Sequence, residues 1–198
     1  MSDHGANSSA SLLPSSELIS LALQGNEEAF TALYHRYTPE LRRYISGLVQ
    51  NQEDRDELVA ETFVKAWQKL PQLQSYERFR AWLYQIATNL AHDHRRREKI
   101  RQWLSLEASA DVASTYTFET VIEEVELAKL ALQEVPWKYR LCLLLSIEGK
   151  FSTQEIAEIV KISPQSVPTY MSYGREAARK AYTRLEEKRE ERKTKAHD

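Results

Sequence analysis

The sequence predicts an all-α protein with two small helical domains joined by a flexible linker. Apolar residues recur at three- and four-residue steps, the period of a helix buried on one face. Glycine and proline number only five and six among 198 residues, which suits long helices with short connections. No alternating run rich in Val, Ile and Thr lies between turn signals, which argues against a sheet. We expect a disordered tail at 1–16, a first domain at 17–105, a linker at 106–118, a second domain at 119–182 and a charged tail at 183–198.

Charge is unevenly distributed along the chain, although the formal net charge is only −2. Acidic residues exceed basic ones by six in 106–135, whereas basic residues exceed acidic ones by three in 136–182. This pattern excludes a uniformly basic DNA-binding protein. If DNA is bound, the acidic segments serve another surface, such as one for a basic partner protein.

The chain offers little for redox, metal or membrane chemistry. Cys142 is the only cysteine, so a buried, inert thiol in a reducing, cytoplasmic setting is expected. His92 and His94 stand two residues apart on an expected helix and point to different faces, so we expect no metal site. No cofactor and no enzymatic activity are expected, because no catalytic constellation accompanies these residues. No apolar run approaches membrane-spanning length, so no membrane insertion is expected.

The first domain is expected to contain five helices. Their expected spans begin at Ser15 or Ser16, at Glu27, at Pro39, near 51 and near 78. The first ends at Gly25-Asn26, and the second ends at Tyr37 because Pro39 is expected to open a new helix. The helix at 51–70 combines an apolar stripe with an acidic side at Asp54, Glu57 and Glu61.

The helix expected at 78–101 combines an apolar face with a polar one. The apolar face should be buried, and it carries Phe79, Trp82, Leu83, Ile86, Ala87 and Leu90. Side chains that can hydrogen-bond base edges form the opposite stripe: Gln85, Thr88, Asn89, His92 and Arg96. Phosphate partners follow at Arg95, Arg97, Lys99 and Arg101. The preceding loop, with Gln74, Ser75 and Tyr76, could capture an unstacked base. The alternative is a core helix with a solvated basic end.

A helix-turn-helix is expected in the second domain. Ser152 and Glu155 form a capping box that opens a short helix, and Ile162-Ser163 forms the turn to a further helix. Pro168 would disrupt a helix that began at Pro164, so the final helix is predicted to begin at Ser166. A plain helical hairpin is the alternative.

Two blocks of the sequence resemble bacterial sigma factors of the compact extracytoplasmic-function type. The first contains D-E-L-V-A-E-T-F-V-K-A-W and F-R-A-W-L-Y-Q-I-A-T-N-L-A-H-D-H-R-R-R, and the second is V-P-W-K-Y-R-L-C-L-L-L-S-I-E-G-K-F-S-T-Q-E-I-A-E-I-V-K-I-S. The resemblance implies a subunit that directs RNA polymerase to promoters and helps to open them. It implies RNA polymerase core and promoter DNA as partners, an anti-sigma factor as a regulator, and no chemistry of its own.

The resemblance also assigns residues to three surfaces. Contact with a coiled coil of the largest polymerase subunit is implied for Asp56, Glu57, Leu58, Glu61 and Thr62. Contact with the minus-ten element is implied for Gln74, Ser75, Tyr76, Gln85, Asn89, His92, Asp93 and Arg96. Contact with the minus-thirty-five element is implied for Ser166, Thr169, Tyr170, Arg175 and Arg179. The segment 106–118 would match the linker that passes through the polymerase channel.

The sequence departs from the family pattern at two places. Ala60 stands where the family usually has a glutamine that contacts polymerase. Pro168, Tyr170 and Tyr173 stand where lysine or arginine is common, and each lost phosphate contact lowers DNA affinity. Two alternatives therefore stay open: a helix-turn-helix regulator that does not engage polymerase, and a sigma-like protein whose final helix binds another protein.

Overall fold

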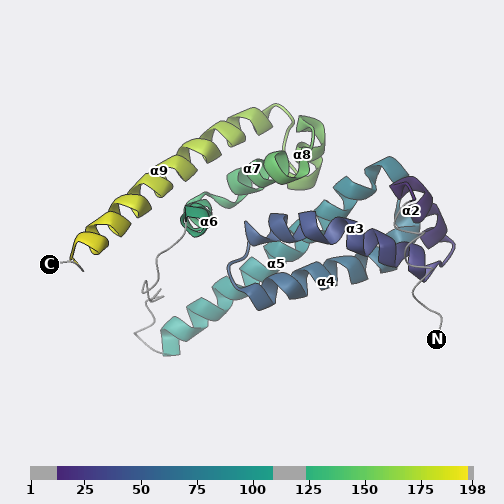
Figure 1. Ribbon diagram of the computed structural model, residues 1–198, viewed down its shortest axis with the longest axis horizontal. Coiled ribbons are helices and arrows are strands. Elements are labelled where there is room, and N and C mark those ends of the chain that lie inside the picture. Colours follow the sequence, from purple (N-terminus) through teal and green to yellow (C-terminus); the bar gives the residue numbers. More distant parts are fainter. Residues whose placement is uncertain (1–12, 109–123, 196–198) are drawn as a thin grey trace. The chain divides into compact units, whose positions relative to one another are not determined.

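The structure is a computed structural model that describes residues 13–108 and 124–195. Every regular element in these two ranges is helical, which confirms the all-α class (Figure 1). The chain divides into two compact units, Met1–Ala91 and His92–Asp198. Helix α5 crosses this division without a break, and the domain limits expected from the sequence stay a prediction. The tail at 1–12 and most of the expected linker lie outside the described residues.

Helices α2 (Ser15–Leu23) and α3 (Glu27–Ser46) begin the first unit and pack on each other. The turn between them is a Schellman motif, because Asn26 N donates to Leu21 O and Gly25 N donates to Ala22 O. Gly25 has φ +86°, a conformation that glycine adopts without a Cβ penalty. Asn26 then caps α3, since its Oδ1 accepts from Ala29 N at 2.9 Å. The sequence prediction that α2 ends at Gly25-Asn26 is confirmed.

Helix α3 runs through Pro39, so the expected break between two shorter helices is wrong. Pro39 is exposed, and its ring points away from the core. On the other side of the same helix, Leu33, Leu41 and Tyr44 are fully buried. Burial of large side chains on both sides of Pro39 outweighs the cost of about 3 kcal/mol for proline inside a helix.

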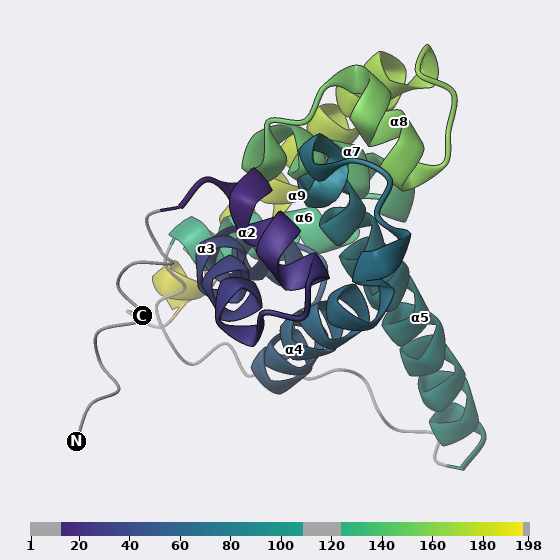
Figure 2. The ribbon, with the colours of Figure 1, turned by 90° about the vertical axis from the view of Figure 1, so that its right-hand side faces the viewer.

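Helix α4 (Gln52–Lys69) packs against α3, and Asn51 caps it by accepting from Asp54 N at 3.1 Å. Two single 3₁₀ turns follow, η1 (Leu70–Gln72) and η2 (Tyr76–Arg78). Helix α5 (Phe79–Ala108) then forms one unbroken rod of 30 residues (Figure 2). It extends past the expected end at 101 and takes in the first residues of the expected linker.

The second unit contains α6 (Glu124–Glu134), α7 (Trp137–Gly149), α8 (Thr153–Val160) and α9 (Ser166–Lys195). Helix α9 packs on all three of the others. The reciprocal capping box of Ser152 and Glu155 is confirmed at the start of α8. Cys142 is fully buried, as expected, and burial raises the pKa of its thiol to about 11.

The predicted start of α9 at Ser166 is confirmed. Pro168 is therefore the third residue of the helix, where the backbone N–H would have no partner within the helix and its absence costs little. Helix α9 continues to Lys195, so most of the expected charged tail is helical. Pairs one turn apart stabilise it, including Lys180 with Glu176 at 2.7 Å.

Gly149 does not adopt the left-handed conformation expected of a helix-ending glycine, because Lys150 takes that role with φ 46°. A Cβ on Gly149 would instead lie 2.1 Å from the ring of Phe151. Phe151 is buried and its backbone N–H donates to Leu145 O. Glycine is thus required here for close packing between the end of α7 and the residue that leads into α8.

Candidate polymerase and nucleic-acid interfaces

The acidic side of α4 presents fewer residues than the sequence predicts. Asp56 and Glu57 are exposed and Glu61 is half-exposed. Leu58 and Thr62 are buried, with 2% and 0% exposure, and the Thr62 hydroxyl donates to Leu58 O at 2.6 Å. Their assignment to a contact surface is therefore corrected: they pack inside the first unit, one helical turn apart.

Two of the exposed carboxylates on α4 form ion pairs at the surface. Arg42 of α3 reaches Asp56 at 3.0 Å, and Lys65 reaches Glu61 at 2.9 Å. Pairs this exposed contribute about 0–1 kcal/mol. Both carboxylates can therefore exchange these partners for a basic group on another protein at small cost.

An apolar groove of about 440 Å³, which was not predicted from the sequence, lies between α3 and α4. Phe30 packs on Trp67 with ring centroids 4.8 Å apart, and Tyr34 packs on Phe63 at 4.7 Å. The other lining residues include Ala60 and the exposed Val64. The only signal in the sequence was Ala60, which lacks the polar side chain that the family places there and leaves an apolar surface open.

The loop before α5 holds its side chains at the surface. Gln74 and Tyr76 are exposed and Ser75 is half-buried. The Ser75 hydroxyl donates to the carboxylate of Glu77, which lowers the pKa of that carboxyl. Phe79 is buried at 1% exposure, which leaves Tyr76, 40% exposed, as the aromatic ring of the loop that is open to solvent.

Arg80 anchors the first turn of α5 to α3. Its Nε and Nη2 donate to the two carboxylate oxygens of Glu40 at 3.0 and 2.7 Å. This paired contact raises the pKa of the guanidinium and fixes the direction in which α5 leaves the loop.

The polar stripe of α5 is exposed at four of its predicted positions: Asn89, His92, Asp93 and Arg96. Gln85 is half-buried. Thr88 is buried, contrary to the sequence analysis, because its hydroxyl lies 2.7 Å from Tyr44 Oη and 2.7 Å from Tyr84 O. Asp93 and Arg96 are 3.9 Å apart, one turn along the helix.

The residues predicted for the minus-thirty-five element do not share one face of α9. Each residue turns the helix by about 100°, so Ser166, Thr169 and Tyr170 lie within about 100° of one another. Arg175 and Arg179 lie about 180° and 140° from Ser166. The structure therefore groups the first three residues with Tyr173 and separates them from the two arginines.

Tyrosine rings gather on this side of the second unit. The ring of Tyr139 on α7 lies 4.9 Å from that of Tyr170 and 6.0 Å from that of Tyr173. Gly174 allows the approach, because a Cβ there would lie 3.0 Å from the Leu143 side chain and 3.2 Å from Tyr139 O. Tyr173 remains 55% exposed.

None of the helices in residues 13–108 and 124–195 is long and apolar enough to cross a membrane.

Comparison with known proteins identifies both halves of the chain. Residues 33–101 match the model of sigma-70 region 2, and residues 126–177 match that of sigma-70 region 4. The ECF RNA polymerase sigma factor SigW of Bacillus subtilis is 28% identical over 169 residues, which cover 79% of this chain and 90% of SigW. The RNA polymerase sigma factor CnrH of Cupriavidus metallidurans is 29% identical over 161 residues, covering 76% of this chain and 84% of CnrH.

Solved structures of sigma factors have the same fold. CnrH in complex with the cytosolic domain of CnrY matches with a TM-score of 0.62 and 25% identity, over 83% of this chain and 94% of CnrH. The sigma factor RpoE of Bartonella quintana, in complex with the anti-sigma factor NepR, matches with a TM-score of 0.65 and 19% identity, over 78% of this chain and 96% of RpoE. With regions 2 and 4 in order along one helical chain, the protein belongs to the extracytoplasmic-function type of sigma-70 factors, the RNA polymerase subunits that direct transcription initiation.

Proposed function

We propose that this sigma factor divides promoter opening among three surfaces. The carboxylates on the acidic side of α4, those of Asp56, Glu57 and Glu61, bind a basic surface on the coiled coil of the largest polymerase subunit. The loop at 74–76 and the α5 stripe bind the minus-ten element. The start of α9, from Ser166 to Tyr173, binds the minus-thirty-five element. The protein acts in the cytoplasm, where polymerase core is available.

The exposed stripe of α5 is the observation that supports this proposal most strongly. Asn89 and His92 can donate to and accept from base edges, and Arg96 can reach a phosphate or a guanine. Arg80 and Glu40 fix the start of α5 directly after the loop, so the stripe leaves the loop in a fixed direction. Base capture by the loop and readout by the helix can then occur together, with binding energy holding the strands apart.

Run-off transcription from a randomised promoter library, with reconstituted holoenzyme, tests the proposal. Asn89→Ala and Arg96→Ala should impair initiation more than Arg175→Ala, because Arg175 lies opposite the Ser166 side of α9. Lys188→Ala, which removes an exposed cation far along α9, serves as the matched control. The reverse ranking would contradict this division of labour, and no start-site enrichment with any supplied core would refute the minus-ten assignment.

The polymerase contact has its own test. Charge reversal at Glu57, which is exposed on α4, should weaken capture of polymerase core, whereas Glu187→Lys on α9 should not. Equal capture by the two variants would remove the acidic side of α4 from the interface.

A second candidate function for α9 rests on the tyrosine cluster. Tyr139, Tyr170 and Tyr173 form an aromatic surface of the kind that is enriched at protein interfaces. If this surface binds another protein instead of DNA, an upstream promoter element should not increase initiation. An anti-sigma factor is a further proposed partner, because RpoE of Bartonella quintana, which has the same fold, is solved in complex with the anti-sigma factor NepR.

A further inference from the structure

Helix α5 continues beyond the minus-ten stripe, and its continuation carries two exposed apolar side chains. Ile100 is 53% exposed and Trp103 is 61% exposed. Ile100 is the penultimate residue of the region 2 match, and Trp103 lies two residues beyond its end. Large apolar side chains this exposed on a rigid helix have a partner in many proteins.

Helical geometry places these side chains on the stripe that begins at Asn89. At about 100° per residue, Arg96, Ile100 and Trp103 lie at about −20°, +20° and −40° from Asn89. Asn89 and Arg96 are exposed as well. The proposed minus-ten surface and the apolar pair thus form one continuous line along a single helix.

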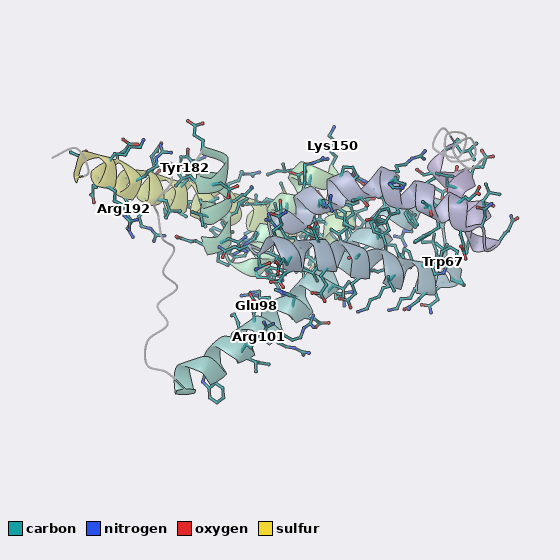
Figure 3. All side chains as sticks on the ribbon, turned by 60° about the horizontal axis from the view of Figure 1, so that its bottom comes forward. Trp67, Glu98, Arg101, Lys150, Tyr182 and Arg192 are labelled. Carbon is teal, nitrogen blue, oxygen red and sulfur yellow. The ribbon has the colours of Figure 1, made fainter. Side chains whose placement is uncertain are left out.

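Cationic side chains flank this line on both sides. Lys99 lies at about −80° from Asn89, and Arg97 and Arg101 lie at about +80° and +120°. All three are exposed, and Figure 3 labels Arg101 and Glu98 on this part of the helix. An α-helix with apolar residues at its centre and cations at both edges fits the major groove, where the centre faces base edges and the edges face the two phosphate backbones.

The length of the line defines how far the contact extends. Asn89 and Trp103 are fourteen residues apart, or about 21 Å along the helix axis. That length spans about six base pairs of duplex at about 3.4 Å per step. Over residues 95–103 the helix carries five basic residues and one acidic residue, so its charge complements DNA.

We propose that Ile100 and Trp103 extend promoter recognition into the duplex beside the minus-ten element, where they make apolar contacts with thymine methyl groups in the major groove. This inference rests on the proposed function of the α5 stripe. It adds a sequence preference about six base pairs away from the position that Asn89 reads. Arg97, Lys99 and Arg101 hold the helix on the backbone and carry no preference of their own.

The test is promoter selection by reconstituted holoenzyme from a library randomised on both sides of the minus-ten element. The wild type should enrich thymine at one or more flanking positions. Ile100→Ala and Trp103→Ala should lose about fivefold or more of that enrichment and keep the minus-ten preference, a loss typical of one mismatched base pair. Replacing the enriched thymines by deoxyuridine, which removes only the methyl group, should weaken the wild type and leave Trp103→Ala unchanged.

Ile147→Ala is the matched control, because Ile147 is 65% exposed on α7 and lies on another helix. Unchanged flanking preference in Ile100→Ala and Trp103→Ala, or no flanking preference in the wild type, would overturn the inference. Weaker binding of Trp103→Ala to polymerase core without DNA would overturn it in favour of a protein contact. If the wild type selects no minus-ten sequence at all, the proposed function of the stripe fails instead.

Discussion

The buried hydrogen bond between Tyr44 and Thr88 allows a sharp stability prediction. Tyr44 is fully buried and Thr88 is 5% exposed. The Thr88 hydroxyl has one proton, which it donates to Tyr84 O at 2.7 Å. Tyr44 must therefore donate the proton in the 2.7 Å contact between the two hydroxyls.

This direction makes the two single substitutions unequal. Tyr44→Phe removes a donor and leaves the Thr88 hydroxyl bonded to Tyr84 O, so it should cost about 1 kcal/mol of unfolding free energy. Thr88→Val keeps the shape of the side chain but removes the Thr88 hydroxyl that accepts from the buried Tyr44 hydroxyl, which should cost about 1–3 kcal/mol. The double variant should cost less than the sum, because neither polar group remains.

Urea unfolding of the full chain, followed by circular dichroism, measures these differences as shifts in the transition midpoint. Because the chain has two units, each can unfold in its own transition. The variants are compared at the transition whose midpoint shifts in both single variants. A larger loss in Tyr44→Phe than in Thr88→Val would refute the assigned direction of the bond, and additive losses in the double variant would refute the bond itself.

Three further predictions follow from the structure. Gly149→Ala should lower the stability of the second unit by about 1–3 kcal/mol, because the new Cβ would lie 2.1 Å from the Phe151 ring. A smaller loss when Phe151→Leu is already present would confirm that this clash is the cause, and an unchanged melting temperature would contradict the prediction. Pro39→Ala should raise stability by up to about 3 kcal/mol, since it restores a backbone bond to His35 O on an exposed face; a lower urea midpoint would contradict this. Burial raises the pKa of the Cys142 thiol from 9.0 to about 11, so the thiol of the unfolded chain ionises first and stability should fall as the pH rises from about 9 to 11. Cys142→Ala should flatten this slope in urea titrations at pH 8 to 11, and an equally steep slope would exclude the thiol as its source.

Local rules predicted the helix ends better than the helix interiors. The Gly25-Asn26 turn, the Ser152 capping box and the start of α9 at Ser166 all depend on backbone groups within a few residues, which the sequence specifies directly. Pro39 was misjudged for the opposite reason. Whether a helix tolerates an internal proline depends on which face is buried and on how much apolar surface the flanking turns bury, and tertiary packing decides both.

The surfaces of α4 and α9 were only partly predictable. An acidic side on α4 follows from the spacing of its carboxylates, but the groove beside Ala60 needs the aromatic rings of α3, which lie some thirty residues earlier in the chain. On α9, the family resemblance implied one DNA contact for both Ser166 and Arg175. Because both residues lie in one continuous helix, the 100° step places them about 180° apart.

Buried threonine accounts for two errors in the candidate surfaces, at Thr62 and Thr88. Thr38, Thr62 and Thr88 are all buried, and each hydroxyl donates to the carbonyl four residues earlier, at 2.6 to 2.7 Å. A threonine in a helix can satisfy its hydroxyl in this way without solvent or a partner, so its polarity does not indicate an exposed face. Asn89 and Arg96 lack a hydroxyl at the β-carbon, and both are exposed. A threonine on a polar helical stripe should therefore be assigned to the surface only when its neighbours one turn away are exposed as well.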